Sequence, residues 1–159
     1  MRPTKYEYFL NMAKLVSSRG TCLRRKVGCV LINARGHVLA TGYNGVASGE
    51  RHCNHEEPNP LNLKPDYPFA CEGSQSPSGQ NLDACKAIHA EQNALLQCRD
   101  AWDIEICFVT TSPCITCVKL LMNTSCGMIV FGEPYAHEGA KDLWTKKPGR
   151  AWLWYGHDS

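Results

Sequence analysis

Two short segments of the chain carry side chains that together suit a metal ion and a proton carrier. The first segment holds His89 and Glu91, two residues apart. The second holds Cys114 and Cys117, three residues apart, and Cys114 follows Glu91 after 22 intervening residues. Two thiolates and one neutral imidazole suit tetrahedral Zn²⁺ and leave its fourth position open to water. Zinc lowers the pKa of such a water to about 7, so the pattern predicts a catalytic zinc site.

The spacing also separates the metal ligands from the proton carrier. Cys114 and Cys117 face the same side of a first helical turn, where the helix dipole favours the thiolate form that binds metal. Glu91 lies too far round a helix from His89 to be an equivalent ligand, and we expect it to move protons. The alternatives are a structural zinc, which would normally show a fourth Cys or His near one pair, or unrelated core residues.

Local signals place both segments at the starts of helices. Residues 87–99 and 113–123 are predicted to be helical, the second with Ser112 as N-cap and Pro113 at its first position, where the missing amide costs nothing. A capping box of Thr4 and Glu7 is predicted to start an N-terminal helix that ends near Gly20. The other predicted elements are a hairpin of strands 27–32 and 38–41, strands 106–111, 128–131 and 152–155, and a short helix 140–144.

This order of elements indicates an α/β fold in a single domain spanning residues 1–159, with one sheet and helices on its faces. Residues 46–84 are rich in Pro, Asn, Ser and Gly and show no periodicity, so we interpret them as a long insertion. A segment of this kind is usually functional or held in place by something.

Composition narrows the class of protein. The net charge of +2 disfavours binding to nucleic acid by charge alone. The chain shows neither a secretory signal in residues 1–20 nor the roughly 20 apolar residues of a membrane span. We therefore expect a cytoplasmic protein whose ten cysteines are mostly reduced, in preference to an extracellular disulfide framework. The cysteines that fall within predicted elements are expected to be core residues: Cys29, Cys98, Cys107 and Cys126.

The two segments carry a family resemblance. His-x-Glu followed by Pro-Cys-x-x-Cys is the signature of zinc nucleobase deaminases. With Gly42-Tyr43-Asn44-Gly45, the run from Ile88 to Ala94, and Thr111-Ser112-Pro113-Cys114, the chain resembles the deoxycytidylate (dCMP) deaminases over about residues 5–135. The resemblance implies a cytidine-deaminase-like three-layer fold with one mixed five-stranded sheet. It also implies hydrolysis of dCMP to dUMP and ammonia by zinc-activated water, with Glu91 as general acid and base.

The resemblance implies further site residues and partners. Those assigned to the substrate are Asn44, Ala90, Ser112 and Tyr135. The loop of Gly42, Tyr43, Asn44 and Gly45 is implied to bind the effectors dCTP, an activator taken with Mg²⁺, and dTTP, an inhibitor. A homo-oligomer, commonly a hexamer, is the family's usual assembly. The basic run of Arg24, Arg25 and Lys26 is either a solvated surface or a phosphate contact, for which Lys26 is the candidate.

Some members of the family carry a second, structural zinc. The resemblance places two of its ligands at Cys22 and Cys53, and the remaining ligands are open among Cys71, Cys85, His52 and His55. A closed zinc site would contribute folding energy to the insertion. The alternative is that these are ordinary reduced cysteines.

Four rival functions stay open. A tRNA adenosine deaminase would share both metal segments, although it usually needs a more basic surface. A deaminase of free cytidine or guanine would share the chemistry, although many cytidine deaminases use cysteine at the position of His89. A deaminase of dCTP would differ only in its phosphate pocket. A zinc-stabilised nucleic-acid-binding module would have a closed metal site and no turnover.

Overall fold

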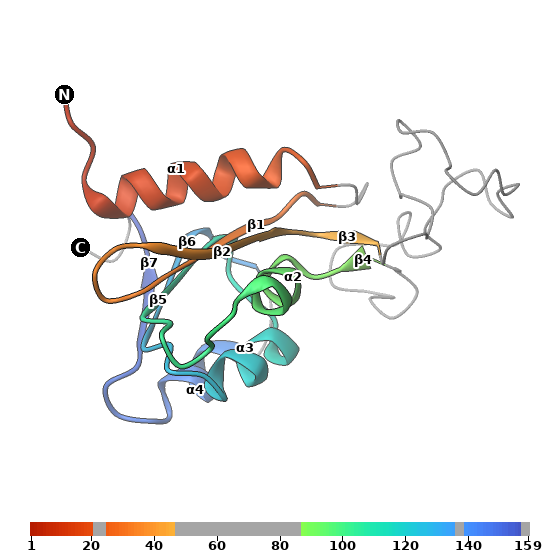
Figure 1. The fold of residues 1–159 in the computed structure, drawn as a ribbon. Helices are drawn as coiled ribbons and strands as arrows, with labels where there is room; N and C mark the ends of the chain where they lie inside the picture. Colours follow the sequence, from red (N-terminus) through yellow and green to blue (C-terminus); the bar gives the residue numbers. More distant parts are fainter. Residues whose placement is uncertain (21–24, 47–86, 136–138, 157–159) are drawn as a thin grey trace, which may run out of the picture.

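The chain folds into three layers around a mixed five-stranded sheet (Figure 1). The computed structural model describes residues 1–20, 25–46, 87–135 and 139–156. In the sheet, β1 pairs antiparallel with β2 and β5, whereas β5, β6 and β7 run parallel to one another. The strand order is β2 (Val38–Tyr43), β1 (Gly28–Ile32), β5 (Ile106–Thr111), β6 (Met128–Glu133) and β7 (Ala151–Trp154). The predicted three-layer fold with a mixed five-stranded sheet is confirmed.

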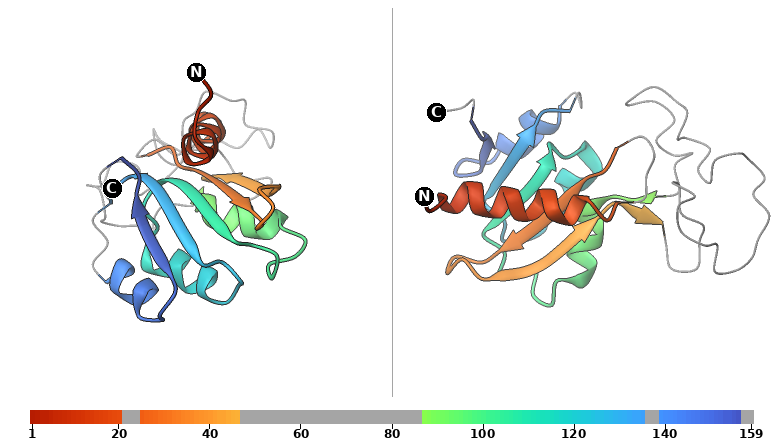
Figure 2. Two further views of the ribbon diagram at one scale, coloured as in Figure 1. Left: turned by 90° about the vertical axis from the view of Figure 1, so that its left-hand side faces the viewer. Right: turned by 90° about the horizontal axis from the view of Figure 1, so that it is seen from above.

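Helices cover both faces of this sheet. The helix α1 (Lys5–Ser17) lies alone on one face, and α2 (Ala90–Gln97), α3 (Ile115–Met122) and α4 (Ala140–Thr145) lie on the other (Figure 2). Among the described residues, no helix has the length and apolar composition needed to cross a membrane.

The inner strand β1 contributes to both faces of the sheet, because successive side chains of a strand point to opposite faces. All five of its residues are buried. Val30 and Ile32 join the core beneath α1 together with Phe108. Cys29 and Leu31 join the core beneath α2, α3 and α4. The sheet therefore separates two apolar cores, and the layer of α2 and α3 is fixed by the second one.

The N-terminal helix begins where the sequence predicts. The Thr4 hydroxyl accepts a hydrogen bond from the amide of Glu7 at 3.1 Å. The Glu7 carboxylate does not complete the expected capping box and instead accepts a hydrogen bond from the Tyr155 hydroxyl at 3.2 Å. The other expected strands and the short helix at residues 140–144 are confirmed, with ends that differ by one or two residues.

Two predicted helix starts are wrong. Ala87 and Ile88 do not begin a helix: they form β4 (Ala87–Ile88), which pairs antiparallel with β3 (Gly45–Val46), and α2 begins after His89. The N-cap of α3 is Cys114 and not Ser112. The hydroxyl of Ser112 is engaged elsewhere, because it accepts a hydrogen bond from the amide of Tyr135 at 2.7 Å. In both helices the N-cap residue is therefore a candidate metal ligand: His89 in α2 and Cys114 in α3.

Candidate active site

The N-termini of α2 and α3 meet on the same face of the sheet and bring three possible metal ligands together. His89 is the N-cap of α2, Cys114 is the N-cap of α3, and Cys117 is the third residue of α3. The Nδ1 atom of His89 lies 3.3 Å from the Sγ atom of Cys117 and 3.5 Å from that of Cys114. Within the part of the chain that the structure describes, this is the one such group of three or more His, Cys, Asp or Glu side chains.

These separations fit zinc. A tetrahedral ion with Zn–S bonds near 2.3 Å and Zn–N bonds near 2.0 Å places its nitrogen and sulfur ligands about 3.6 Å apart. All three ligand atoms lie within 4.8 Å of one another. No fourth Cys, His, Asp or Glu of the described residues joins these three soft or borderline ligands, which suits a zinc ion that keeps an open position. The donor set and its spacing therefore fit a catalytic zinc ion.

Hydrogen bonds fix the start of α2 and with it His89. The Gln92 side chain accepts from the amide of His89 at 2.9 Å, and the amide of Asn93 donates to the carbonyl of His89 at 2.9 Å. The Asn93 side chain donates to the carbonyl of Tyr43 at 2.8 Å and so ties α2 to β2. Sequence reasoning did not single out Gln92 or Asn93, because polar residues of a first helical turn look alike in a sequence.

Glu91 is the second residue of α2 and lies beside the three ligands with only 4% of its surface exposed. Burial raises the pKa of the Glu91 carboxyl to about 7, against the opposing effects of its own backbone amide and of His89. The charge of a bound dication would lower this value. A carboxyl that exchanges its proton near neutral pH is suited to act as a general acid and base.

The two thiols differ in their protonation. A hydrogen bond from Cys117 lowers the pKa of the Cys114 thiol to about 3, with a further contribution from His89. The same hydrogen bond, together with burial, raises the pKa of the Cys117 thiol. The metal-free pair therefore shares one proton, which a zinc ion would displace on binding.

The segment from Gly42 to Gly45 lies against the start of α2 and is not an open turn. Gly42 belongs to β2, and a Cβ atom there would overlap the carbonyl of Ala90 and the amide of Ala94, so glycine allows α2 to approach the sheet closely. Gly45 pairs with Ile88 in the β3–β4 ladder. This ladder, which sequence reasoning missed because its strands have only two residues each, places Asn44 and His89 at the same end of a small sheet.

Asn44 is 8% exposed and its side chain bonds to the backbone that precedes β1. Its Oδ1 atom accepts from the amide of Val27 at 2.9 Å, and its Nδ2 atom donates to the carbonyl of Arg25. The amide nitrogen keeps a second hydrogen for a ligand. Asn44 therefore braces residues 25–27, while its assignment to the substrate sugar stays a prediction.

The remaining substrate candidates fall into two groups. Ser112, which lies two residues before Cys114, is hydrogen-bonded to the amide of Tyr135. The guanidinium of Arg25 stacks on the Tyr135 ring, 4.2 Å from the ring centroid. Ala90 is 1% exposed at the first turn of α2. Lys26 is exposed.

The candidates for a second zinc lie outside the described residues: Cys22, His52, Cys53, His55, Cys71 and Cys85. Of the four cysteines expected in the core, Cys29, Cys107 and Cys126 are buried, whereas Cys98 is half-buried.

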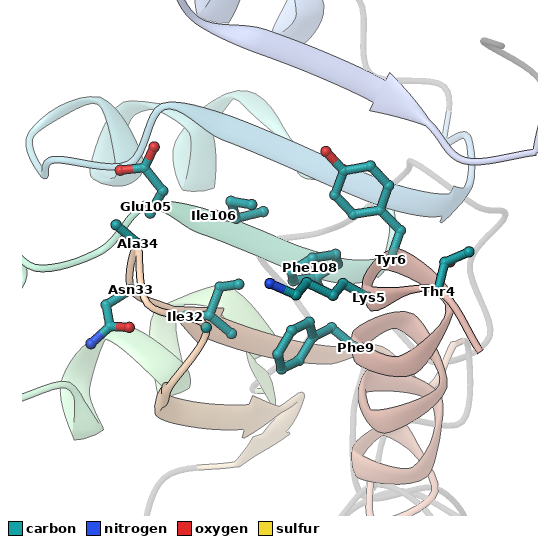
Figure 3. Close-up of a pocket in the computed structure, with 11 residues that line it drawn as sticks. Thr4, Lys5, Tyr6, Phe9, Ile32, Asn33, Ala34, Glu105, Ile106 and Phe108 are labelled. Carbon is teal, nitrogen blue, oxygen red and sulfur yellow. The ribbon is translucent and has the colours of Figure 1, made fainter. Parts of the chain in front are cut away.

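A pocket of about 380 Å³ lies on the opposite face of the sheet and is distinct from this site (Figure 3). Tyr6 and Phe9 of α1 line it together with Ile32 and Phe108 of the sheet. It contains no candidate metal ligand or proton carrier of the α2–α3 layer.

Comparisons with known proteins agree with this geometry. Residues 3–133 match the model of the cytidine and deoxycytidylate deaminase zinc-binding region. The chain is 35% identical over 136 residues to a deoxycytidylate deaminase of Schizosaccharomyces pombe, covering 84% of this chain and 38% of that protein. It is also 35% identical over 132 residues to a deoxycytidylate deaminase of Mycobacterium phage D29, covering 82% of this chain and 95% of that protein.

A solved structure extends the comparison to the fold. The dCMP deaminase of cyanophage S-TIM5, in complex with dCMP and dUMP, superposes with a TM-score of 0.67 at 26% identity. The alignment covers 96% of this chain and 97% of the phage chain. By contrast, the chain spans well under half the length of two fungal relatives, 38% and 39%.

Proposed function

The chain belongs to the family of cytidine and deoxycytidylate deaminases, and we propose that it hydrolyses dCMP to dUMP and ammonia. The observation that carries the proposal is the meeting of His89, Cys114 and Cys117 at two helix caps, with the buried carboxyl of Glu91 beside them. Relatives described as deoxycytidylate deaminases, one of them solved with dCMP and dUMP, support the choice of substrate.

The roles of the residues follow from their chemistry. His89, Cys114 and Cys117 would hold zinc, which when bound supplies a water of lowered pKa for attack on C4 of cytosine. Glu91 would accept a proton from the attacking water and deliver it to N3 of the ring. It would then accept the proton of the new C4 hydroxyl and deliver it to the amino group, which leaves as ammonia as the C4 carbonyl forms. Because a carboxyl group can both accept and donate a proton, Glu91 can perform both halves of this transfer without a second residue. Asn93 and Gln92 hold the imidazole-bearing turn of α2 in position.

A substrate panel tests this function. We expect ammonia release from dCMP to exceed that from CMP, dCTP, cytidine and guanine when each is supplied to the zinc-loaded full chain. Preferred turnover of dCTP would move the assignment to a triphosphate deaminase. Turnover of adenosine in a tRNA, with none of any free nucleotide, would favour the tRNA rival. Absence of all turnover with zinc bound would favour a non-catalytic zinc module.

We further propose that nucleotide effectors act on this enzyme, dCTP with Mg²⁺ as activator and dTTP as inhibitor, through Gly42, Tyr43, Asn44 and Gly45. The support is the family resemblance of this segment, together with its position, because it spans the end of β2 and the start of the β3–β4 ladder, next to His89. A ligand that moved this segment would move the start of α2. Rates of dCMP turnover with and without each nucleotide test the proposal, and an unchanged rate contradicts it.

We also propose that residues 1–159 form a single deaminase domain, that the protein is a cytoplasmic hexamer, and that it holds a structural zinc. The proposed ligands of this zinc are Cys22, Cys53, Cys71 and Cys85. Metal analysis tests the last of these directly, because it predicts two zinc ions per chain where the catalytic site alone predicts one. Sedimentation of the full chain tests the hexamer.

A further inference from the structure

Arg150 lies at the C-terminal end of α3, the helix whose N-terminal turn carries two of the three candidate zinc ligands. Its Nη2 atom donates a hydrogen bond to the carbonyl of Met122, the last residue of α3, at 3.2 Å. The last carbonyl groups of a helix lack partners within the helix and form its negative end, so they favour a cation. Arg150 therefore supplies both the donor and the charge that this end of α3 needs.

A tight turn before β7 fixes the backbone of Arg150. Residues 147–150 read Lys-Pro-Gly-Arg, and Pro followed by Gly favours a type II turn. Gly149 has the positive φ of 94° that such a turn requires, and the amide of Arg150 donates to the carbonyl three residues earlier at 3.4 Å. The next amide, that of Ala151, donates to the carbonyl of Gly127 at 2.9 Å. The turn is thus attached to the start of β6.

The guanidinium of Arg150 is held by Trp144 of α4, the helix beside α3 (Figure 1). It lies 4.8 Å from the centroid of the Trp144 ring. That ring is buried in the same apolar core as Val118 and Leu121 of α3, and its nitrogen donates to the carbonyl of Ala151 at 2.8 Å. Both the backbone and the side chain of Arg150 are therefore fixed with respect to the sheet.

The bond from Arg150 determines the position of α3 along its own axis. The buried side chains of α3 attach it to the sheet, but apolar burial is non-directional and packed helices can slide slightly. A hydrogen bond is directional. Because α3 has eight residues and is about 12 Å long, a shift at Met122 is transmitted to Cys114 and Cys117. Zinc sites tolerate deviations of only about 0.2 Å in their bond lengths.

We propose that Arg150 is a positioning residue for the catalytic zinc, which keeps the thiols of Cys114 and Cys117 at the distance from His89 that the ion requires. This rests on the zinc site of the proposed function. Arg150 acts through α3 and is not itself a ligand. It also lies beyond residue 133, where the match to the family's zinc-binding region ends.

Competition for zinc with the chelator 4-(2-pyridylazo)resorcinol measures the affinity of the full, zinc-loaded chain. In Arg150→Met we expect the zinc affinity to fall about 3- to 30-fold, the range for a residue coupled to a site that it does not touch. Arg150→Lys should recover part of the affinity, because an ammonium group can still donate to the carbonyl of Met122. Lys147→Met is the matched control, since Lys147 is an exposed cation of the same turn and should leave the affinity unchanged.

A second control separates positioning from a general loss of stability. Phe9→Leu weakens the core on the opposite face of the sheet and should leave the zinc affinity unchanged. The visible absorption of the Co²⁺-substituted chain is a further readout, because its bands depend on the geometry of the thiolate ligands. We expect the bands to change in Arg150→Met and to stay unchanged in Phe9→Leu.

Wild-type zinc affinity in Arg150→Met would overturn the inference. An equal loss of affinity in Phe9→Leu would also overturn it, because Arg150 would then only stabilise the fold. A wild-type chain that binds no zinc would reject the zinc site of the proposed function together with this inference. Zinc binding that depends on Arg150, in a chain that does not deaminate dCMP, would uphold the inference and reject the reaction alone.

Discussion

Gly42 in β2 lies so close to Ala90 in the first turn of α2 that a methyl group at position 42 would overlap the Ala90 carbonyl oxygen. The distance between sheet and helix at this point fixes how far His89 and Glu91 reach toward the thiols of α3. The glycine that the sequence suggests as part of an effector loop therefore has a packing role that is independent of any effector.

Gly42→Ala is expected to displace α2. Overpacking of a tight contact costs about 1–3 kcal/mol of unfolding free energy, and the shift of His89 should also weaken zinc binding. Urea unfolding and zinc titration measure the two effects. Gly127→Ala is the control, because a Cβ there meets its nearest neighbour only at 4.0 Å and should change stability by less than about 1 kcal/mol. Equal behaviour of the two variants would contradict the packing argument.

Glu91→Gln is expected to abolish proton transfer while keeping the shape of the side chain. General acid–base catalysis contributes about 10²- to 10⁴-fold, so kcat for dCMP should fall by at least that much while zinc content stays at the wild-type value. Glu105→Gln provides the comparison, since that carboxylate is exposed and lines the pocket on the opposite face. A variant lacking Glu91 that retained full turnover would remove this residue from the mechanism.

Loss of a thiol ligand is expected to remove the catalytic zinc. Cys117→Ser should lower the zinc content by one ion per chain and abolish activity, because a hydroxyl is a far weaker zinc ligand than a thiolate. Atomic absorption and activity measure this, with Cys98→Ser as the control outside the ligand group. Proton release on zinc binding to the stripped wild type is a second measure, since the Cys114–Cys117 pair would lose the proton it shares. Unchanged zinc content in Cys117→Ser would contradict the ligand assignment.

The buried thiols are expected to make the protein less stable in alkali. Burial raises the pKa of the Cys126 thiol above its ordinary value of 9.0, and a hydrogen bond to Cys29 and burial raise that of Cys107. A raised folded-state pKa means that the unfolded chain loses its protons first, so the stabilisation is complete below pH 9 and declines as the pH rises above it.

Urea unfolding between pH 7 and 10.5 measures this decline. Cys126→Ala should reduce its slope, and Cys98→Ala should leave it unchanged because Cys98 is only half-buried. Iodoacetamide at pH 8 should leave Cys107 and Cys126 of the native protein unmodified. Rapid labelling of either thiol without unfolding would contradict their burial.

The sequence predicts the elements better than the way they are capped and joined. The ligand set could be predicted because its residue types are rare and its spacing is specific. The start of α2 could not, because Ala87 and Ile88 suit a helix as well as a strand, and only pairing with Gly45 and Val46 decides between them. Tertiary contacts override local preference in such short segments.

Arg25 and Lys26 show that the site is subject to the same limit of prediction from sequence. Adjacent cations look equivalent in a sequence, and the contact of Arg25 with Tyr135, 110 positions along the chain, distinguishes them only after folding. The hydroxyl of Ser112 likewise suits an N-cap by its type, yet the fold uses it to hold the amide of Tyr135.

The β3–β4 ladder has a consequence for how this sequence can change over evolution. Val46 and Ala87 are paired, so the two ends of the 40-residue segment between them lie at the same point of the domain. The entropy of closing a chain segment grows slowly, by only about 0.6 kcal/mol for each doubling of its length. A change in the number of residues between these two positions would therefore cost the zinc site little in loop-closure entropy, which makes this junction a natural place for relatives to diverge in length.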